Sequence, residues 1–224
     1  LWDELDDLEL SSETVVCGYV GDVRHALKVM GLPDPPTIDY PDSLWGHLGR
    51  EVWRSDVNTM LVSTETLFVK PYDRQKLFTG FVKGPAFTDK IRLAGIVGET
   101  EVWVSEPVEF ITEYRTFLMM GKPVGIKHYK GDPFVTPDRY TVESMVQAWY
   151  DQPAACTIDV GVTADGRTLL IECNDGFAFG NYGLPPITYA RMLEARWRQL
   201  TGASLPPPPL EAPGWPTGKA QRDP

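Results

Sequence analysis

The segment 156–174 constrains the fold most, because it joins two apolar strands through a tight turn that contains Asp165 and Gly166. An Asp-Gly pair between alternating apolar runs is typical of an antiparallel hairpin. The expected register brings Asp159 of the first strand beside Glu172 and Asn174 at the end of the second. Because side chains alternate along a strand, residues 172 and 174 share one face. The sequence therefore predicts a hairpin that gathers two carboxylates and one amide.

These three side chains offer hard oxygen ligands of the kind that Mg²⁺ prefers. Asp159 and Glu172 each follow a run of apolar or small residues, where a carboxylate needs a partner to offset the loss of its hydration. The alternative is that acidic residues near strand ends are simply solvated. The pattern by itself leaves both interpretations open.

A second motif is the strand Phe68-Val69-Lys70-Pro71, after which comes a polar loop that contains Lys76 and closes at Gly80. A lysine at the end of an apolar strand, followed by a basic turn, suits a phosphate site because it supplies a point charge beside backbone N–H groups. The alternative is a lysine whose charged end merely reaches solvent from a strand end.

A third motif runs from the alternating strand 101–104 through an irregular link at 105–109 to Glu113. Such a link can expose backbone groups to an adenine edge, and a carboxylate shortly after it can bind ribose hydroxyls. Without context the same pattern is a plain strand–loop–strand.

Other patterns predict the remaining elements. Further strands are expected at 15–20, 81–82, 91–94, 114–120 and 122–126, and helices at 25–30 with Asp22 as cap, 44–48, 141–150 and 187–200.

In order and spacing, these motifs resemble the ATP-grasp superfamily over about residues 60–185. The resemblance rests on residues 68–71, on 105–108 followed by Glu113, and on Asp159 followed by the Glu172–Asn174 segment. It implies an α+β fold in which two αβ lobes clasp ATP, beside a reduced N-terminal βα unit. The expected domains are an acidic arm (1–13), the N-terminal unit (14–58), the ATP-grasp lobes (59–203) and a proline-rich tail (204–224).

The resemblance also implies roles for individual residues. Phosphate contacts fall to Lys70 and Lys76, adenine to Glu106, Pro107, Val108 and Glu109, ribose to Glu113, and one or two magnesium ions to Asp159, Glu172 and Asn174.

One departure concerns the arginine that many ATP-grasp ligases carry two residues before the metal aspartate. Thr157 stands at that position here. The compensating catalytic cation is expected among Arg115, Lys127 and Lys130. This pattern is similar to a small clade in which lysine replaces such an arginine.

The implied activity is that of a Mg-ATP-dependent ligase, which joins a carboxylate of an amino acid or peptide to an amine through an acyl phosphate. A small-molecule kinase on the same scaffold, or a nucleotide-binding module without turnover, remains an alternative. The expected partners are small-molecule or peptide substrates, and the sequence leaves the oligomeric state open.

Composition excludes some classes. A net charge of −10 and a pI of 4.8 disfavour nucleic acid as a partner, because phosphate backbones are repelled. No apolar run approaches the roughly 18 residues of a membrane-spanning helix. The three cysteines lie among apolar or small neighbours without metal-type spacing, which predicts buried free thiols and a cytoplasmic location.

Overall fold

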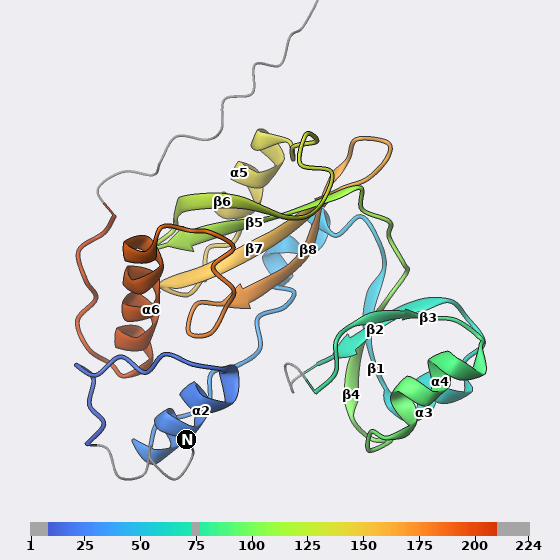
Figure 1. The fold of residues 1–224 in the computed structure, drawn as a ribbon, viewed down its shortest axis with the longest axis horizontal. Coiled ribbons are helices and arrows are strands. Elements are labelled where there is room, and N and C mark those ends of the chain that lie inside the picture. Colours follow the sequence, from blue (N-terminus) through green and yellow to red (C-terminus); the bar gives the residue numbers. More distant parts are fainter. Residues whose placement is uncertain (1–8, 73–76, 210–224) are drawn as a thin grey trace, which may run out of the picture. The chain divides into compact units, whose positions relative to one another are not determined.

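The structure is a computed structural model that describes residues 9–72 and 77–209. The chain divides by packing into two compact units (Figure 1). Unit 1 comprises Leu1–Trp45 and Ile111–Pro224, and unit 2 comprises Gly46–Phe110. Residues 14–45 of the predicted N-terminal unit therefore pack within unit 1, and residues 46–58 within unit 2. The predicted domain bounds themselves stay a prediction.

Unit 2 is an antiparallel sheet in the order β1-β4-β2-β3, with two helices on one face (Figure 1). Its core joins buried residues of the strands, such as Val69 and Val104, to Val57 and Met60 of α3 and Leu93 of α4. The elements are β1 (Val52–Asp56), α3 (Val57–Val62), β2 (Leu67–Pro71), β3 (Phe81–Lys83), α4 (Phe87–Ala94) and β4 (Glu101–Ser105).

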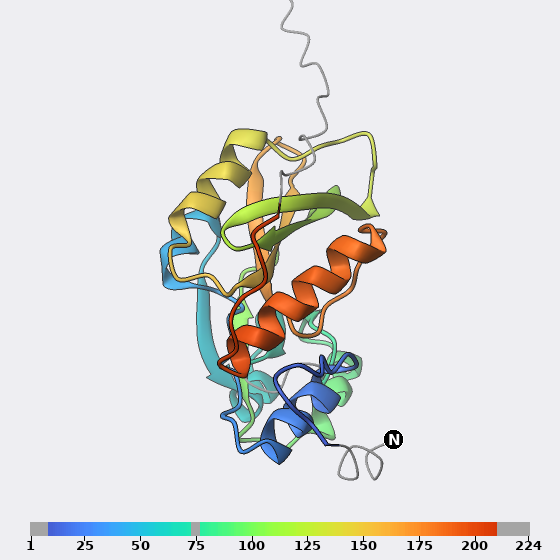
Figure 2. The same cartoon turned by 90° about the vertical axis from the view of Figure 1, so that its left-hand side faces the viewer.

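Unit 1 is an antiparallel sheet in the order β6-β5-β7-β8, with helices α5 and α6 on opposite faces (Figures 1 and 2). Phe117, Met119 and Ala155 of the sheet pack against Met192 and Ala195 of α6. The elements are α2 (Val20–Val29), β5 (Thr112–Met119), β6 (Lys122–Gly131), α5 (Arg139–Ala148), β7 (Ala155–Val162), β8 (Thr168–Asp175) and α6 (Pro186–Leu200), and a 3₁₀ helix, η1 (Asp42–His47), crosses into unit 2.

The two hairpins that the sequence predicts are confirmed. β5 and β6 meet at Met120 and Gly121, both of which have positive φ angles, 48° and 76°. Successive positive φ values are typical of a tight hairpin turn whose twist matches that of the strands. In the second hairpin, Asp159 lies directly opposite Glu172, as expected. The predicted α+β fold is thereby confirmed.

Three local predictions are wrong. Residues 15–19 form no strand, and Val15 and Val16 instead pack as irregular chain against α2 and Trp197. Asp22 is not the N-cap of α2 but its third residue, from which the carboxylate accepts a hydrogen bond from the Tyr19 N–H at 2.8 Å.

The predicted strand 91–94 lies in helix α4. In a strand, Ile91 and Leu93 would share one face, but Leu93 is fully buried and Ile91 is 55% exposed. A short apolar run cannot distinguish a strand from a buried helical turn. The prediction of buried cysteines holds for Cys156 and Cys173 and is wrong for Cys17, which is exposed.

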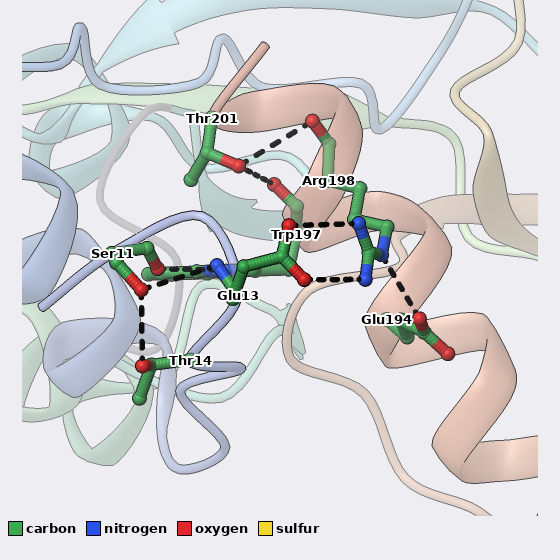
Figure 3. A network of polar contacts seen from close by, with 7 residues as sticks. All are labelled: Ser11, Glu13, Thr14, Glu194, Trp197, Arg198 and Thr201. Atoms are coloured by element: carbon green, nitrogen blue, oxygen red, sulfur yellow. Dashed lines mark hydrogen bonds and ion pairs between the residues drawn. The ribbon is translucent and has the colours of Figure 1, made fainter. Parts of the chain in front are cut away.

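A polar network ties the N-terminal segment to α6 (Figure 3). Arg198 binds both carboxylate oxygens of Glu13, at 3.2 and 2.9 Å, and also binds Glu194 at 2.9 Å. The indole N–H of Trp197 donates to the carbonyl oxygen of Ser11 at 3.4 Å. Residues 11–14 are thus fixed along the last turns of α6.

A second arginine of α6 makes a buried pair. The Arg196 guanidinium donates to both oxygens of Asp175 at 2.6 Å, and both side chains are less than a tenth exposed. Its remaining nitrogen donates to Gln199 at 2.7 Å, and Gln199 in turn accepts from the Ala154 N–H. The pair therefore connects α6 to the end of β8 and the start of β7.

We expect Arg196→Gln to lower the free energy of unfolding by about 3–5 kcal/mol, because it leaves the buried Asp175 carboxylate without its cation. Arg198→Gln is the matched control on the same helix, and its loss should be far smaller because this pair is exposed. Urea unfolding of both variants measures the difference. Equal losses would show that burial does not set the strength of the Arg196 pair.

Candidate functional site

The predicted site residues fall in both units. Unit 2 holds Lys70 and the link 106–109, and unit 1 holds Glu113, Arg115, Lys127, Lys130, Asp159, Glu172 and Asn174. Lys76 lies outside the described residues. The geometry is therefore described separately within each unit.

Four charged residues form one row across the sheet of unit 1. Strand register places Lys127 of β6 opposite Arg115 of β5, Arg115 opposite Asp159 of β7, and Asp159 opposite Glu172 of β8. Directly opposed side chains in an antiparallel sheet lie about 4.5–5.5 Å apart at Cβ and project from the same face. The row thus runs from two cations to two carboxylates.

At the centre of the row, Arg115 and Asp159 form a bidentate ion pair. Arg115 Nε donates to Asp159 Oδ1 at 2.7 Å, and Nη2 donates to Oδ2 at 2.6 Å. Arg115 is 6% exposed and Asp159 is 2% exposed. Burial acts to lower the pKa of the guanidinium, but the hydrogen bonds and charge of Asp159 outweigh it, so the pKa of Arg115 is raised and the arginine stays charged.

Asn174 joins the two carboxylates of the row. Its side-chain nitrogen donates to Asp159 Oδ2 and to Glu172 Oε1, both at 3.4 Å. Thr157, which is opposite Asn174, is fully buried, and its hydroxyl has no hydrogen-bond partner among the described residues. The predicted ligands are therefore assembled around a polar position that still has an unpaired oxygen.

The donor set fits a hard cation such as Mg²⁺. Two carboxylates, an amide and a neighbouring hydroxyl are all oxygen ligands, and Mg²⁺ is commonly bound through one or two carboxylates. In the described part of the chain, no cluster of three or more His, Cys, Asp or Glu side chains is arranged to hold a metal. The candidate site therefore depends on Asn174 as its third member.

A β-bulge positions a second polar group beside the row. Between Glu113–Lys130 and Tyr114–His128 the register shifts, so Tyr129 is an extra residue in β6. Lys130 Nζ binds Glu113 Oε1 at 2.5 Å, and the Tyr129 side chain hydrogen-bonds Glu113. Burial raises the pKa of Tyr129, and the charges of Asp159 and Glu113 raise it further, so its phenol stays protonated.

The loop after β8 is attached to the same face. Gly176 begins it, and a Cβ there would lie 2.2 Å from the Ala155 carbonyl oxygen, so only glycine allows this close approach. Arg115 Nη1 donates to the Gly180 carbonyl oxygen at 3.3 Å, and its guanidinium lies 4.8 Å from the centre of the Tyr182 ring. Tyr182 in turn stacks on Tyr129 at 4.9 Å. Arg115 therefore binds both Asp159 and this loop.

Sequence reasoning missed these two tyrosines and the Arg115–Asp159 pair. Both tyrosines lie in segments that the sequence singled out for their lysines or glycines. Only the cross-strand register, which joins residues 44 positions apart, brings them together.

In unit 2, Lys70 of β2 lies opposite Trp103 of β4, and Trp103 lies opposite Arg54 of β1. Lys70 is 8% exposed. The loop before β3 comes close, because a Cβ on Gly80 would lie 3.0 Å from the Lys70 Cβ. Tyr72 packs on Trp103 at 5.1 Å, and Arg54 lies 4.0 Å from the centre of the Tyr72 ring. Lys70 thus belongs to a row of cationic and aromatic side chains.

The predicted adenine link is irregular, as expected. Residues 106–111 connect β4 to β5 without helix or strand. Glu106 is held by Glu51, whose N–H donates to Glu106 Oε2 at 3.1 Å and whose carbonyl oxygen accepts from the Glu106 N–H at 3.3 Å. The backbone at Glu106 is therefore already paired.

A groove of about 750 Å³ lies elsewhere in unit 1. Its walls come from the proline-rich segment 33–42, from residues near the end of α5, and from Arg196, Gln199 and Leu200 of α6. None of the predicted site residues lines it. No helix in the described ranges is long and apolar enough to cross a membrane.

Comparisons with known proteins bear on this geometry. A search of curated proteins found no match. Among solved structures, the ATP-grasp ligase PsnB in complex with a minimal precursor is 12% identical, with a TM-score of 0.42, over 68% of this chain and 60% of that one. A RimK-domain ATP-grasp protein from Sphaerobacter thermophilus is 14% identical, with a TM-score of 0.44, over 65% and 60%. The macrocyclase MdnC from Microcystis aeruginosa, bound to the precursor peptide MdnA, is 19% identical, with a TM-score of 0.43, over 70% and 56%.

The chain thus spans about 60% of the length of the first two of these proteins. Similarities of this size do not by themselves indicate a shared activity. The family comparison is stronger, because the model of an ATP-grasp domain, family 2 of the R-to-K clade, matches residues 47–192, well over half of the chain. That match includes both predicted phosphate and metal segments, and this chain belongs to the ATP-grasp superfamily, in family 2 of that clade.

Proposed function

We propose that the protein is an ATP-dependent ligase that joins a carboxylate to an amine through an acyl-phosphate intermediate. The observation that carries the proposal is the charged row of unit 1, in which two carboxylates and Asn174 meet two cations in a member of this superfamily. Phosphoryl transfer needs positioning and charge neutralisation rather than a nucleophilic side chain, and this row supplies both signs of charge.

The nucleotide contacts follow the family pattern. Lys70 and Lys76 would bind phosphate, Glu106, Pro107, Val108 and Glu109 would receive adenine, and Glu113 would bind ribose. Lys130 already binds Glu113, so in this proposal it stays beside the sugar and holds that carboxylate in place.

Asp159, Glu172 and Asn174 would hold Mg²⁺, which when bound shields the phosphate charges. Arg115 and Lys127, both cationic and adjacent in the row, would stabilise the negative charge that develops on the transferred phosphoryl group. The loop 176–183 would bring the amine to the acyl phosphate, since it lies on the same face as the row and is tethered there by Arg115.

The substrates that we propose are amino acids, short peptides or a peptide terminus. The net charge of −10 makes nucleic acid a poor partner. A kinase acting on a small molecule would use the same charged row, and it is the alternative that the experiments must separate.

We expect Glu172→Gln to fold normally and to lower ATP turnover about 100-fold, because an anionic ligand is lost where charge is stabilised. Glu143→Gln is the matched control, since Glu143 lies on α5 and pairs with Arg139. Release of ADP measures both. Undiminished turnover in the Glu172 variant would remove it from the site.

Replacement of Lys70 by alanine should raise the dissociation constant for ATP roughly ten- to a hundredfold, which is the usual contribution of a hydrogen bond to a charged group. Lys90→Ala removes the same charge from helix α4 of the same unit and should leave the constant unchanged. Calorimetric titration with ATP checks both variants. If both weaken binding equally, Lys70 acts through the general field and not as a phosphate ligand.

The reaction type is tested by incubating the protein with Mg-ATP and a pool of amino acids and peptides. A ligase releases ADP and inorganic phosphate only when the amine is present, and its product is heavier by one amino-acid residue. Mass spectrometry identifies the product. Phosphorylated metabolites as the sole new species would favour the kinase.

A further inference from the structure

We propose that Arg115 and the divalent cation compete for Asp159, so that entry of the cation releases Arg115 and loosens the loop that Arg115 holds. The inference rests on the proposed metal role of Asp159 and adds to it a form of regulation. Arg115 is then a positioning residue that holds the cation's place in the resting protein.

The first observation is how completely Arg115 uses the aspartate. It donates to both Oδ1 and Oδ2 within 2.7 Å, and the pair is nearly inaccessible to water. A planar guanidinium fits a carboxylate in this fork geometry better than any other side chain. A cation that needs Asp159 must therefore use its remaining lone pairs or displace the fork.

The second observation is the charge balance of the row. Lys127 and Arg115 carry two positive charges, and Asp159 and Glu172 carry two negative charges, so the row is neutral without a metal. A dication added while Arg115 stays in place would put a guanidinium and a metal on one carboxylate. In a site of low dielectric that repulsion is strong, and withdrawal of Arg115 relieves it.

The third observation is the orientation of Asn174. Its NH₂ group faces both carboxylates, so donors of the protein supply the positive partners that a metal would otherwise supply. A cation would require the amide oxygen instead, and the amide must turn over. Asn174 and Arg115 thus share one arrangement, which a cation would replace as a unit.

The fourth observation links this exchange to the loop. Arg115 Nη1 holds the Gly180 carbonyl oxygen, and its guanidinium packs on the Tyr182 ring, which itself stacks on Tyr129. Loss of the arginine from Asp159 removes two of these contacts together. The loop that we propose as the approach of the amine would therefore loosen when the cation is bound.

The test uses Mn²⁺ as the probe, without nucleotide, because it takes the same oxygen ligands and its free form is measured directly by electron paramagnetic resonance. Arg115→Met should bind Mn²⁺ at least tenfold more tightly than the wild type, because the competitor is gone. Arg115→Lys, which keeps the charge without the fork, should be intermediate. Arg167→Gln, which breaks an exposed pair with Asp165 at the other end of the hairpin, should not change the constant.

Stability gives a second readout. Without metal, Arg115→Met should melt below the wild type, because Asp159 is left buried without a cation. Mn²⁺ should raise its melting temperature more than that of the wild type, because the ion fills the vacated role. Asp159→Asn should remove the Mn²⁺ effect from both backgrounds.

Hydrogen exchange tests the loop. In the wild type, Mn²⁺ should speed exchange of the amides at residues 180–184, and in Arg115→Met those amides should already exchange fast. If Arg115→Met does not fold, this wild-type comparison decides alone, and unchanged exchange with Mn²⁺ bound overturns the proposal.

The outcomes separate two failures. Equal or weaker Mn²⁺ binding by folded Arg115→Met overturns the competition and leaves the metal role intact. If neither protein binds Mn²⁺, with or without ATP, the proposed metal site itself is wrong and the competition falls with it.

Discussion

The buried pair of Arg115 and Asp159 is the interaction on which the sheet of unit 1 depends. A carboxylate in the middle of β7, with apolar neighbours on the opposite face, would be too costly to bury alone. The guanidinium across the strand offsets that cost with two short hydrogen bonds. Because both groups are buried, the pair adds little net stability, yet the loss of either partner is expensive. The fold therefore commits a charged row to the centre of its sheet.

One face of this sheet serves two purposes. Phe117, Met119 and Ala155 cover it at one end and pack under α6, whereas the charged row occupies the same face two residues farther along β5. Polar groups at the centre of a sheet are rare in a purely structural domain, because burying them gains nothing over apolar packing. Their presence beside a well-packed apolar end is the physical reason to assign them a ligand.

Much of this organisation is predictable from the sequence, and the reason is local. Hairpins are set by turn chemistry and alternation, so the opposed positions of Asp159 and Glu172 follow from Asp165-Gly166. The family resemblance, which depends on order and spacing, is confirmed. The failures share a cause as well: the runs at 15–20 and 91–94 are too short for periodicity to distinguish irregular chain, helix and strand. The pairing of β5 with β7 is non-local, so no local signal indicates that Arg115 faces Asp159.

The register itself depends on two irregularities. Beyond Asp159 the pairing of β7 with β8 shifts by one residue, and between Glu113 and Tyr114 the pairing of β5 with β6 shifts as well. A bulge adds one residue to one strand and re-aims the side chains beside it. Regular pairing would alternate Tyr129 and Lys130 onto opposite faces, but both contact Glu113. The bulge in β6 therefore lets one carboxylate receive a phenol and an ammonium from adjacent residues, next to the row whose charges the proposed chemistry needs.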